Sequence, residues 1–210
     1  WSNERAHQQQ CEQHAPQQRP PSLAVPPYSS SCSPFNLLRV LLLGGSTGEH
    51  NPAAFAKMLA DAVQKNNIEL TYTEDLNALT PENLGTFDVF AIYRDGREGE
   101  ELSEAREAAL VGAVEGGTGF VAIGGAARCF LKSERYGKLI GGRPGPIEVS
   151  DFRARIIDAQ HAATRNVRSF TSRDETMTHS QLSNDLRVLM ARVRDTAYEP
   201  VTWVRTAGNC

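Results

Sequence analysis

Residues 37–45 read LLRVLLLGG, a short apolar run closed by two glycines. A run of this length, interrupted only by Arg39, is typical of a strand that is buried on both faces of a sheet. Asn51 and Pro52 then supply a helix N-cap and a first-turn proline, and apolar residues recur on one helical face from 55 to 63. The order of strand, loop and helix predicts the first unit of an α/β domain.

The same alternation continues along the chain. Residues 68–73, 87–93 and 119–123 are predicted to form strands, a helical turn begins at Thr80, and Ser103 caps a helix that stops at a glycine pair. Strands and helices that alternate at this spacing predict a doubly wound, mostly parallel sheet with helices on both faces, a three-layer flavodoxin-like arrangement.

The two ends of the chain differ from this pattern. Residues 1–36 are rich in Gln, Pro and Ser and are predicted to form a disordered tail, which places the start of the domain at residue 37. In the last third, the segments 152–157, 186–193 and 201–206 look like strands joined by polar loops. The sequence therefore predicts one α/β domain, 37–210, that ends in a strand-rich extension.

Composition excludes several partners. The 210 residues carry a formal net charge of −3 and no basic stretch interleaved with aromatics, so nucleic acid is not an expected partner. The four cysteines lie far apart, unlike those of a structural zinc site or a disulfide framework. No apolar run is long enough to cross a bilayer. Composition leaves both cytoplasmic and exported locations as alternatives, with the cytoplasm favoured. Assembly into a homo-oligomer is a further alternative.

Two familiar active-site motifs are absent. The glycine loop at 44–48 lacks the third glycine of a dinucleotide fingerprint and the Gly-Lys-Ser/Thr of a nucleotide P-loop. The turn after strand 119–123, where many α/β enzymes place a nucleophile, carries Gly124. Cys129 is expected in the core, where a thiol is inert. A mechanism through a Cys or Ser nucleophile is therefore disfavoured.

Three histidines provide the best functional clue. His50 follows the first strand, His161 follows a later one, and His179 lies near the acidic pair Asp174 and Glu175. Because ligands bind at the carboxyl ends of parallel strands, His50 and His161 are expected to face one pocket with the two carboxylates close by. These groups suit general acid–base transfer or a divalent metal ion held by some of the three histidines, and both alternatives remain open.

Each candidate also has a purely structural explanation. His50 fits an exposed loop residue, and His161 fits a hydrogen bond to neighbouring backbone. The acidic pair fits a surface ion pair with Arg168 or Arg173. Convergence of the histidines and a carboxylate on one pocket would favour an enzyme, and a scattered arrangement would favour a binding module.

Several segments occur in an order that resembles a known family. They are residues 39–45 with His50, 72–90 with Thr-Glu-Asp and Pro-Glu-Asn-Leu-x-x-Phe-Asp, 115–126, 136–142, and His161 with Asp174 and Glu175. From Leu38 to Cys210 this order resembles the trehalose-utilisation (ThuA-like) family, a branch of the class I glutamine amidotransferase-like fold. The resemblance implies a protein of disaccharide or oxidised-sugar metabolism without a cysteine nucleophile, in agreement with Gly124.

The chain also departs from that family. Its members usually carry a histidine where this chain has Gly124, and a Phe and a His-Pro pair where residues 143–146 read Arg-Pro-Gly-Pro. They also continue into a further strand after the region 201–206, so a chain that stops at Cys210 is expected to be truncated. The altered segments put simple transfer of the family's activity in doubt.

Two functions are weighed. The first is a sugar-processing enzyme with His161, Asp174 and Glu175 as catalytic groups and a small-molecule carbohydrate as partner, with no certain cofactor and a divalent ion left open. Its substrate-binding residues are expected to be His50, Tyr93 as an aromatic platform, Arg94, Gly124 and Gly125. The second is a non-catalytic ligand-binding or assembly module that kept the fold after losing its active groups.

Overall fold

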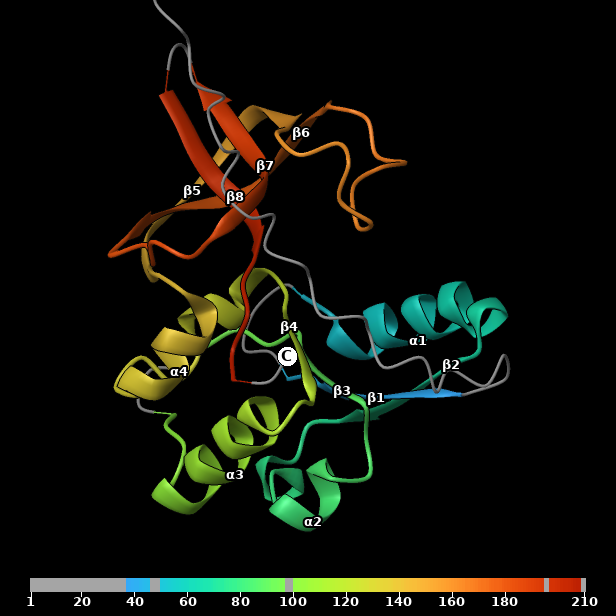
Figure 1. Cartoon of the computed structure of the whole chain (residues 1–210). Coiled ribbons are helices and arrows are strands. Elements are labelled where there is room, and N and C mark those ends of the chain that lie inside the picture. The colour runs from blue at the N-terminus through green and yellow to red at the C-terminus, as the bar shows by residue number, and fades with distance from the viewer. Residues whose placement is uncertain (1–36, 46–49, 97–99, 195–196, 209–210) are drawn as a thin grey trace, which may run out of the picture. The chain divides into compact units, whose positions relative to one another are not determined.

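The computed structural model describes residues 37–45, 50–96, 100–194 and 197–208, with Arg194 described by its backbone alone (Figure 1). The predicted tail at 1–36 and residues 46–49 of the glycine loop lie outside the described residues.

Four of the predicted strands form one parallel sheet. They are β1 (Leu38–Leu43), β2 (Ile68–Thr73), β3 (Val89–Ile92) and β4 (Gly119–Ala122), hydrogen-bonded in the order β2-β1-β3-β4. β1 pairs with β2 along one edge and with β3 along the other, as its apolar composition requires. These strand predictions are confirmed, with differences of one or two residues at the strand ends.

Helices begin where the sequence supplies caps. Asn51 Oδ1 accepts a hydrogen bond from the Ala54 amide at 3.0 Å, and Ser103 Oγ accepts one from the Arg106 amide at 3.4 Å. The helices are α1 (Pro52–Val63), α2 (Pro81–Leu84), α3 (Glu104–Glu115) and α4 (Glu134–Ile140), with the 3-10 turns η1 (Gln64–Asn66), η2 (Leu76–Ala78) and η3 (Gly124–Arg128).

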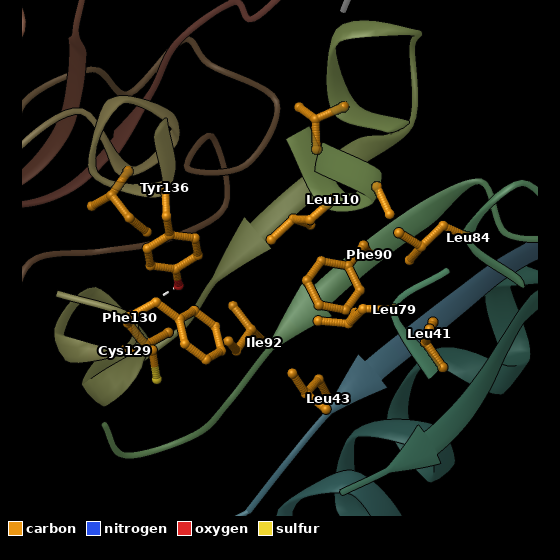
Figure 2. Packing of buried hydrophobic residues seen from close by; sticks show 14 residues of the cluster. Leu41, Leu43, Leu79, Leu84, Phe90, Ile92, Leu110, Cys129, Phe130 and Tyr136 are labelled. Atoms are coloured by element: carbon orange, nitrogen blue, oxygen red, sulfur yellow. Dashed lines mark hydrogen bonds between the residues drawn. The ribbon is translucent and has the colours of Figure 1, made fainter. Parts of the chain in front are cut away.

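The leucine run of β1 supplies two apolar clusters on opposite faces of the sheet. Leu41 and Leu43 belong to the cluster that contains Leu110 of α3 (Figure 2), whereas Leu42 belongs to the cluster that contains Ala56 of α1. Successive side chains of a strand point to opposite faces, so this division follows from the period of the strand. Burial of each leucine contributes about 1.5–3 kcal/mol.

The last third forms a second, antiparallel sheet. Its strands are β5 (Arg143–Ile156), β6 (Phe170–Ser180), β7 (Arg187–Arg194) and β8 (Ala197–Val204), in the order β6-β5-β7-β8. The structure is therefore mixed α/β, with one parallel and one antiparallel sheet of four strands each among the described residues.

One prediction about this extension is wrong. The segment around Asp174 and Glu175 was predicted to be a loop, but it lies inside β6, which pairs with β5. One of its charged residues has a partner on β5: Arg173 lies opposite Asp151, with 3.4 Å between Nη1 and Oδ1. Cross-strand ion pairs of this kind make a charged segment compatible with a strand.

Side chains of the β8 region are bonded to α4. Trp203 Nε1 donates a hydrogen bond to the Ile140 carbonyl oxygen at 2.8 Å, and Arg205 donates one to the Lys138 carbonyl oxygen. These bonds also satisfy carbonyl groups in the last turn of α4, which lack helical partners. Along the described part of the chain, no helix has the length and apolar character needed to cross a membrane.

Candidate functional site

Three candidate residues lie beyond the carboxyl ends of strands of the parallel sheet. His50 follows β1, Tyr93 follows β3, and Gly124 follows β4. The His50 and Tyr93 rings are stacked, with centroids 6.3 Å apart and 9° between their planes. The ring of Phe55 in α1 packs against the Tyr93 ring, with 4.2 Å between their centroids. Phe55 of α1 and the end of β3 therefore hold the Tyr93 ring in place beside His50.

A carboxylate from the other sheet completes this group. Glu175 Oε2 of β6 lies 3.7 Å from His50 Nε2, and their side chains are 46% and 34% exposed. An ion pair with this exposure contributes little to stability, about 0–1 kcal/mol. The imidazole and the carboxylate are therefore both accessible to a ligand and close enough to exchange a proton through it.

Tyr93 is held in its protonated form. Burial raises the pKa of its phenol above the ordinary value, and the charges of Asp95, Asp174 and Glu175 raise it further. A protonated phenol can donate a hydrogen bond as well as offer its ring face. Tyr93 is therefore suited to donate a hydrogen bond to a ligand oxygen, while its ring contacts His50 and Phe55.

The turn after β4 has the elbow shape expected from the sequence, without a reactive side chain. Gly124 has a φ of +56°, a left-handed conformation, and a Cβ at this position would lie 3.8 Å from the Tyr93 ring. At Gly125 a Cβ would lie 2.1 Å from Asp95 Oδ1 and 3.2 Å from the Arg94 carbonyl oxygen, so a side chain there would displace Asp95. Both glycines bring bare backbone to the strand ends.

A cavity of about 550 Å³ opens beside this elbow. Its walls come from β4, α4, β6 and β8, and they are mainly apolar. Its small and polar lining residues include Gly124, Asp174, Glu175, Thr176 and His179. A volume of this size lies in the usual range for sites that hold a small molecule. Glu175 connects the cavity to His50, which is not itself on the wall.

His179 lies in the antiparallel sheet and is buried. Its side chain is 7% exposed, and its ring meets Trp203 edge to face, with centroids 4.9 Å apart. Its amide donates a hydrogen bond to Glu199 Oε1 at 2.7 Å, whereas its Nδ1 is 3.6 Å from that oxygen. Burial lowers the pKa of His179, against the opposite effect of Glu199. The imidazole is therefore neutral near pH 7.

His161 makes its contacts within its own loop. Its amide donates to Asp158 Oδ1 at 3.1 Å, and its Nδ1 accepts a hydrogen bond from the Ala163 amide at 3.2 Å. It is not on the cavity wall, and no contact joins it to His50 or Glu175 within the described ranges. The expected meeting of His161 with His50 is therefore corrected, because the strand before His161, β5, belongs to the antiparallel sheet.

Arg94 is also placed differently from the expectation. Its side chain is 6% exposed, and its Nε and Nη2 donate to the two oxygens of Glu100 at 2.9 and 2.5 Å. Its Nη1 donates to the Gly44 carbonyl oxygen. A buried guanidinium needs such partners, and here they use all three of its nitrogens. Arg94 thus ties the loop after β1 to the loop after β3 and has no free group for a substrate.

Cys129 is buried as predicted. Its thiol is 3.3 Å from the Arg94 carbonyl oxygen, and burial raises its pKa to about 12. A thiol of such high pKa is not a nucleophile at neutral pH.

The metal-ligand candidates His50, His161 and His179 do not come together. Among the described residues, no group of three or more His, Cys, Asp or Glu side chains forms a site that could hold a metal ion. Sequence reasoning also missed Trp203, whose ring lines the cavity. Its only signal was an aromatic residue in a predicted strand.

Comparisons with known proteins identify the family and support the fold. The family model described as trehalose utilisation matches residues 39–210. A ThuA-like protein from Bacteroides uniformis has a similar structure, with a TM-score of 0.66 and 15% identity over 87% of this chain and 82% of the other. A ThuA-like protein from Parabacteroides merdae has a TM-score of 0.64 and 12% identity over 83% and 77% of the two chains.

The fold also resembles that of a glutamine amidotransferase. The Thermotoga maritima enzyme has a TM-score of 0.50 and 13% identity over 81% of this chain and 72% of its own. A search of curated proteins gave no match. Since the family model covers nearly all of the described residues, the chain belongs to the trehalose-utilisation (ThuA) family.

Proposed function

We propose that this domain, which belongs to a carbohydrate-utilisation family, binds a sugar or an oxidised sugar beside His50, Tyr93 and Glu175. The observation that carries the proposal is the pairing of His50 with Glu175, a residue that also lines a mainly apolar cavity. Sugars are recognised by an aromatic face together with a few charged hydrogen-bonding groups, and this group of residues supplies both.

The topology of the sheet supports this location. We infer a doubly wound sheet, since the chain places β2 on one side of β1 and β3 with β4 on the other. The switch in direction then falls between β1 and β3, and ligands of such sheets bind beyond the strand ends at that point. His50 and Tyr93 follow these two strands.

The same residues suit proton transfer on an oxidised sugar. A C–H bond next to a carbonyl group is acidic enough for a positioned base, and either His50 Nε2 or Glu175 can accept that proton. The negative charge that develops on the carbonyl oxygen needs a donor, and the protonated phenol of Tyr93 can supply one. The other partner of the His50–Glu175 pair then returns the proton to the product.

Binding can be tested by titration calorimetry and thermal shift of the full chain. The ligands are a set of monosaccharides, disaccharides and their oxidised derivatives. A saturable rise in melting temperature is expected for at least one of them. His50→Ala and Glu175→Gln should each weaken that ligand about tenfold or more, because each removes a hydrogen bond to a charged or polar group.

His161→Ala is the matched control, since His161 lies off the cavity wall. It should leave the affinity unchanged. Binding that is insensitive to both His50→Ala and Glu175→Gln would place the ligand elsewhere and end the proposal, as would the absence of any shift in a well-folded sample.

The second candidate is a binding module without turnover. Gly124 favours it, because the elbow of this site offers no side chain to the ligand. The two functions can be distinguished by incubating the bound ligand with the protein. A product that forms with the unmodified protein but not with Glu175→Gln indicates an enzyme, and a ligand recovered intact indicates a binding module.

A further inference from the structure

The cavity continues along β6 from Glu175 to His179. Glu175, Met177 and His179 all line it, and so do the intervening Asp174 and Thr176 of this edge strand. Four residues of strand cover about 13 Å. That length exceeds one pyranose ring, so a single sugar beside Glu175 leaves the far end of the cavity empty.

The far end is a rigid aromatic wall. Trp203 faces the cavity, and the bond from its Nε1 to the Ile140 carbonyl oxygen fixes the plane of the indole. Leu139, Ile140 and Met177 line the cavity as well. Arg205 is also on the wall, but its two terminal nitrogens bond to the Lys138 carbonyl oxygen and to Asp185. The surface offered to a ligand here is therefore mainly apolar.

His179 adds one polar group to this wall. Its Nδ1 is buried without a hydrogen-bond partner, and the charge of Glu199 Oε1, 3.6 Å away, favours the tautomer with the proton on Nδ1. Its Nε2 then has a free lone pair, and no hydrogen bond to it is found among the described residues. A neutral imidazole in this state accepts one hydrogen bond from a hydroxyl group.

We propose that His179 and Trp203 form a second subsite, which binds the aromatic aglycone of an aryl glycoside and accepts a hydrogen bond from its phenolic hydroxyl group. This inference rests on the proposed function, which places the sugar beside His50 and Glu175. A second sugar ring fits less well, since the wall around Trp203 is mainly apolar and would leave several of its hydroxyl groups without partners. A flat aromatic ring with one hydroxyl group matches both the indole and the imidazole.

The test uses four glucosides that differ only in the aglycone. They are 4-hydroxyphenyl, phenyl and methyl glucoside and the disaccharide maltose, each titrated into the full chain by calorimetry. Phenyl glucoside should bind more tightly than methyl glucoside, and the 4-hydroxyl group should improve affinity a further three- to tenfold or so. Maltose should bind more weakly than either aryl glucoside.

Variants of His179 test whether this residue causes the gain in affinity from the 4-hydroxyl group. His179→Phe keeps a ring of similar size and should abolish the advantage of 4-hydroxyphenyl over phenyl glucoside, with the affinity for methyl glucoside unchanged. His179→Gln, which keeps an acceptor, should restore part of it. Glu175→Gln should weaken all four ligands. The comparison of ligands on the unmodified protein stands even where a variant fails to fold.

The outcomes separate the two ideas. Equal affinity for 4-hydroxyphenyl and phenyl glucoside, an advantage that survives His179→Phe, or a preference for maltose overturns the aglycone subsite. If methyl glucoside or maltose still binds and depends on Glu175, the proposed function stands without it. If no glycoside or oxidised sugar binds the folded protein, the proposed function falls and the subsite with it.

Discussion

Single residues explain both the successes and the errors of sequence reasoning about this site. His50 and Tyr93 could be found because each follows a strand that the apolar pattern revealed. Arg94 follows the same strand as Tyr93, but its side chain is buried against Glu100. A sequence does not show which of two neighbouring residues points inward at a strand end, because that depends on the register of the strand with its neighbours.

Arg94 also makes Gly45 irreplaceable. Gly45 has a φ of +119°, and a Cβ there would lie 2.0 Å from Arg94 Nη1. Gly45→Ala should therefore lower the free energy of unfolding by about 2–4 kcal/mol, through backbone strain and the displaced guanidinium. Urea unfolding of the variant measures the loss.

Gly112→Ala provides the control for that measurement. Gly112 lies inside α3 and an added Cβ would meet nothing within 4 Å, so alanine there should stabilise the domain by roughly 0.5–1 kcal/mol. Equal effects of the two substitutions would contradict the contact with Arg94.

At the scale of elements, β6 is a strand that the sequence pattern did not predict. The strands of the parallel sheet are apolar runs, which the sequence reveals directly. β6 reads FTSRDETMTHS, with three charged residues in succession, and it becomes a strand only through its pairing with β5. Such pairing between distant segments overrides local preference.

Burial of His179 within β6 makes the stability of the domain depend on pH. Its folded-state pKa is lowered from the ordinary 6.5, chiefly by burial and also by Arg192, while Glu199 opposes the shift. The unfolded chain therefore binds the proton more readily, and stability should fall as the pH drops below about 6.5. Thermal melts between pH 7.5 and 5 should show a shallower decline for His179→Phe than for the unmodified protein. Parallel declines would remove His179 as the cause.

At the scale of the whole described domain, the candidate site joins two sheets that the sequence could not orient. The parallel sheet supplies His50 and Tyr93, and the antiparallel sheet supplies Glu175. The fold class could be predicted because each strand and helix carries its own signal. A carboxylate of the acidic pair beside His50 was expected as well, but the sequence could not show that Glu175 makes the contact from an antiparallel strand, because residues 125 positions apart in the chain meet only through the packing of complete elements.

This pairing should matter to binding rather than to folding. The His50 and Glu175 side chains are each at least one third exposed. Glu175→Gln should therefore change the free energy of unfolding by less than about 1 kcal/mol, even where it abolishes ligand affinity. Chemical denaturation alongside the binding titration checks this. A loss of several kcal/mol would instead make the pair a structural contact.

β6 is hydrogen-bonded within its sheet to β5 alone, and its residues line much of the cavity. The leucines that hold the parallel sheet together lie in other elements. Mutations along β6 can accumulate with little penalty to that core, so ligand preference in this fold can diverge between lineages while the scaffold is conserved. Libraries that vary only the cavity-facing positions of β6 are accordingly the economical way to change which ligand the proposed site prefers.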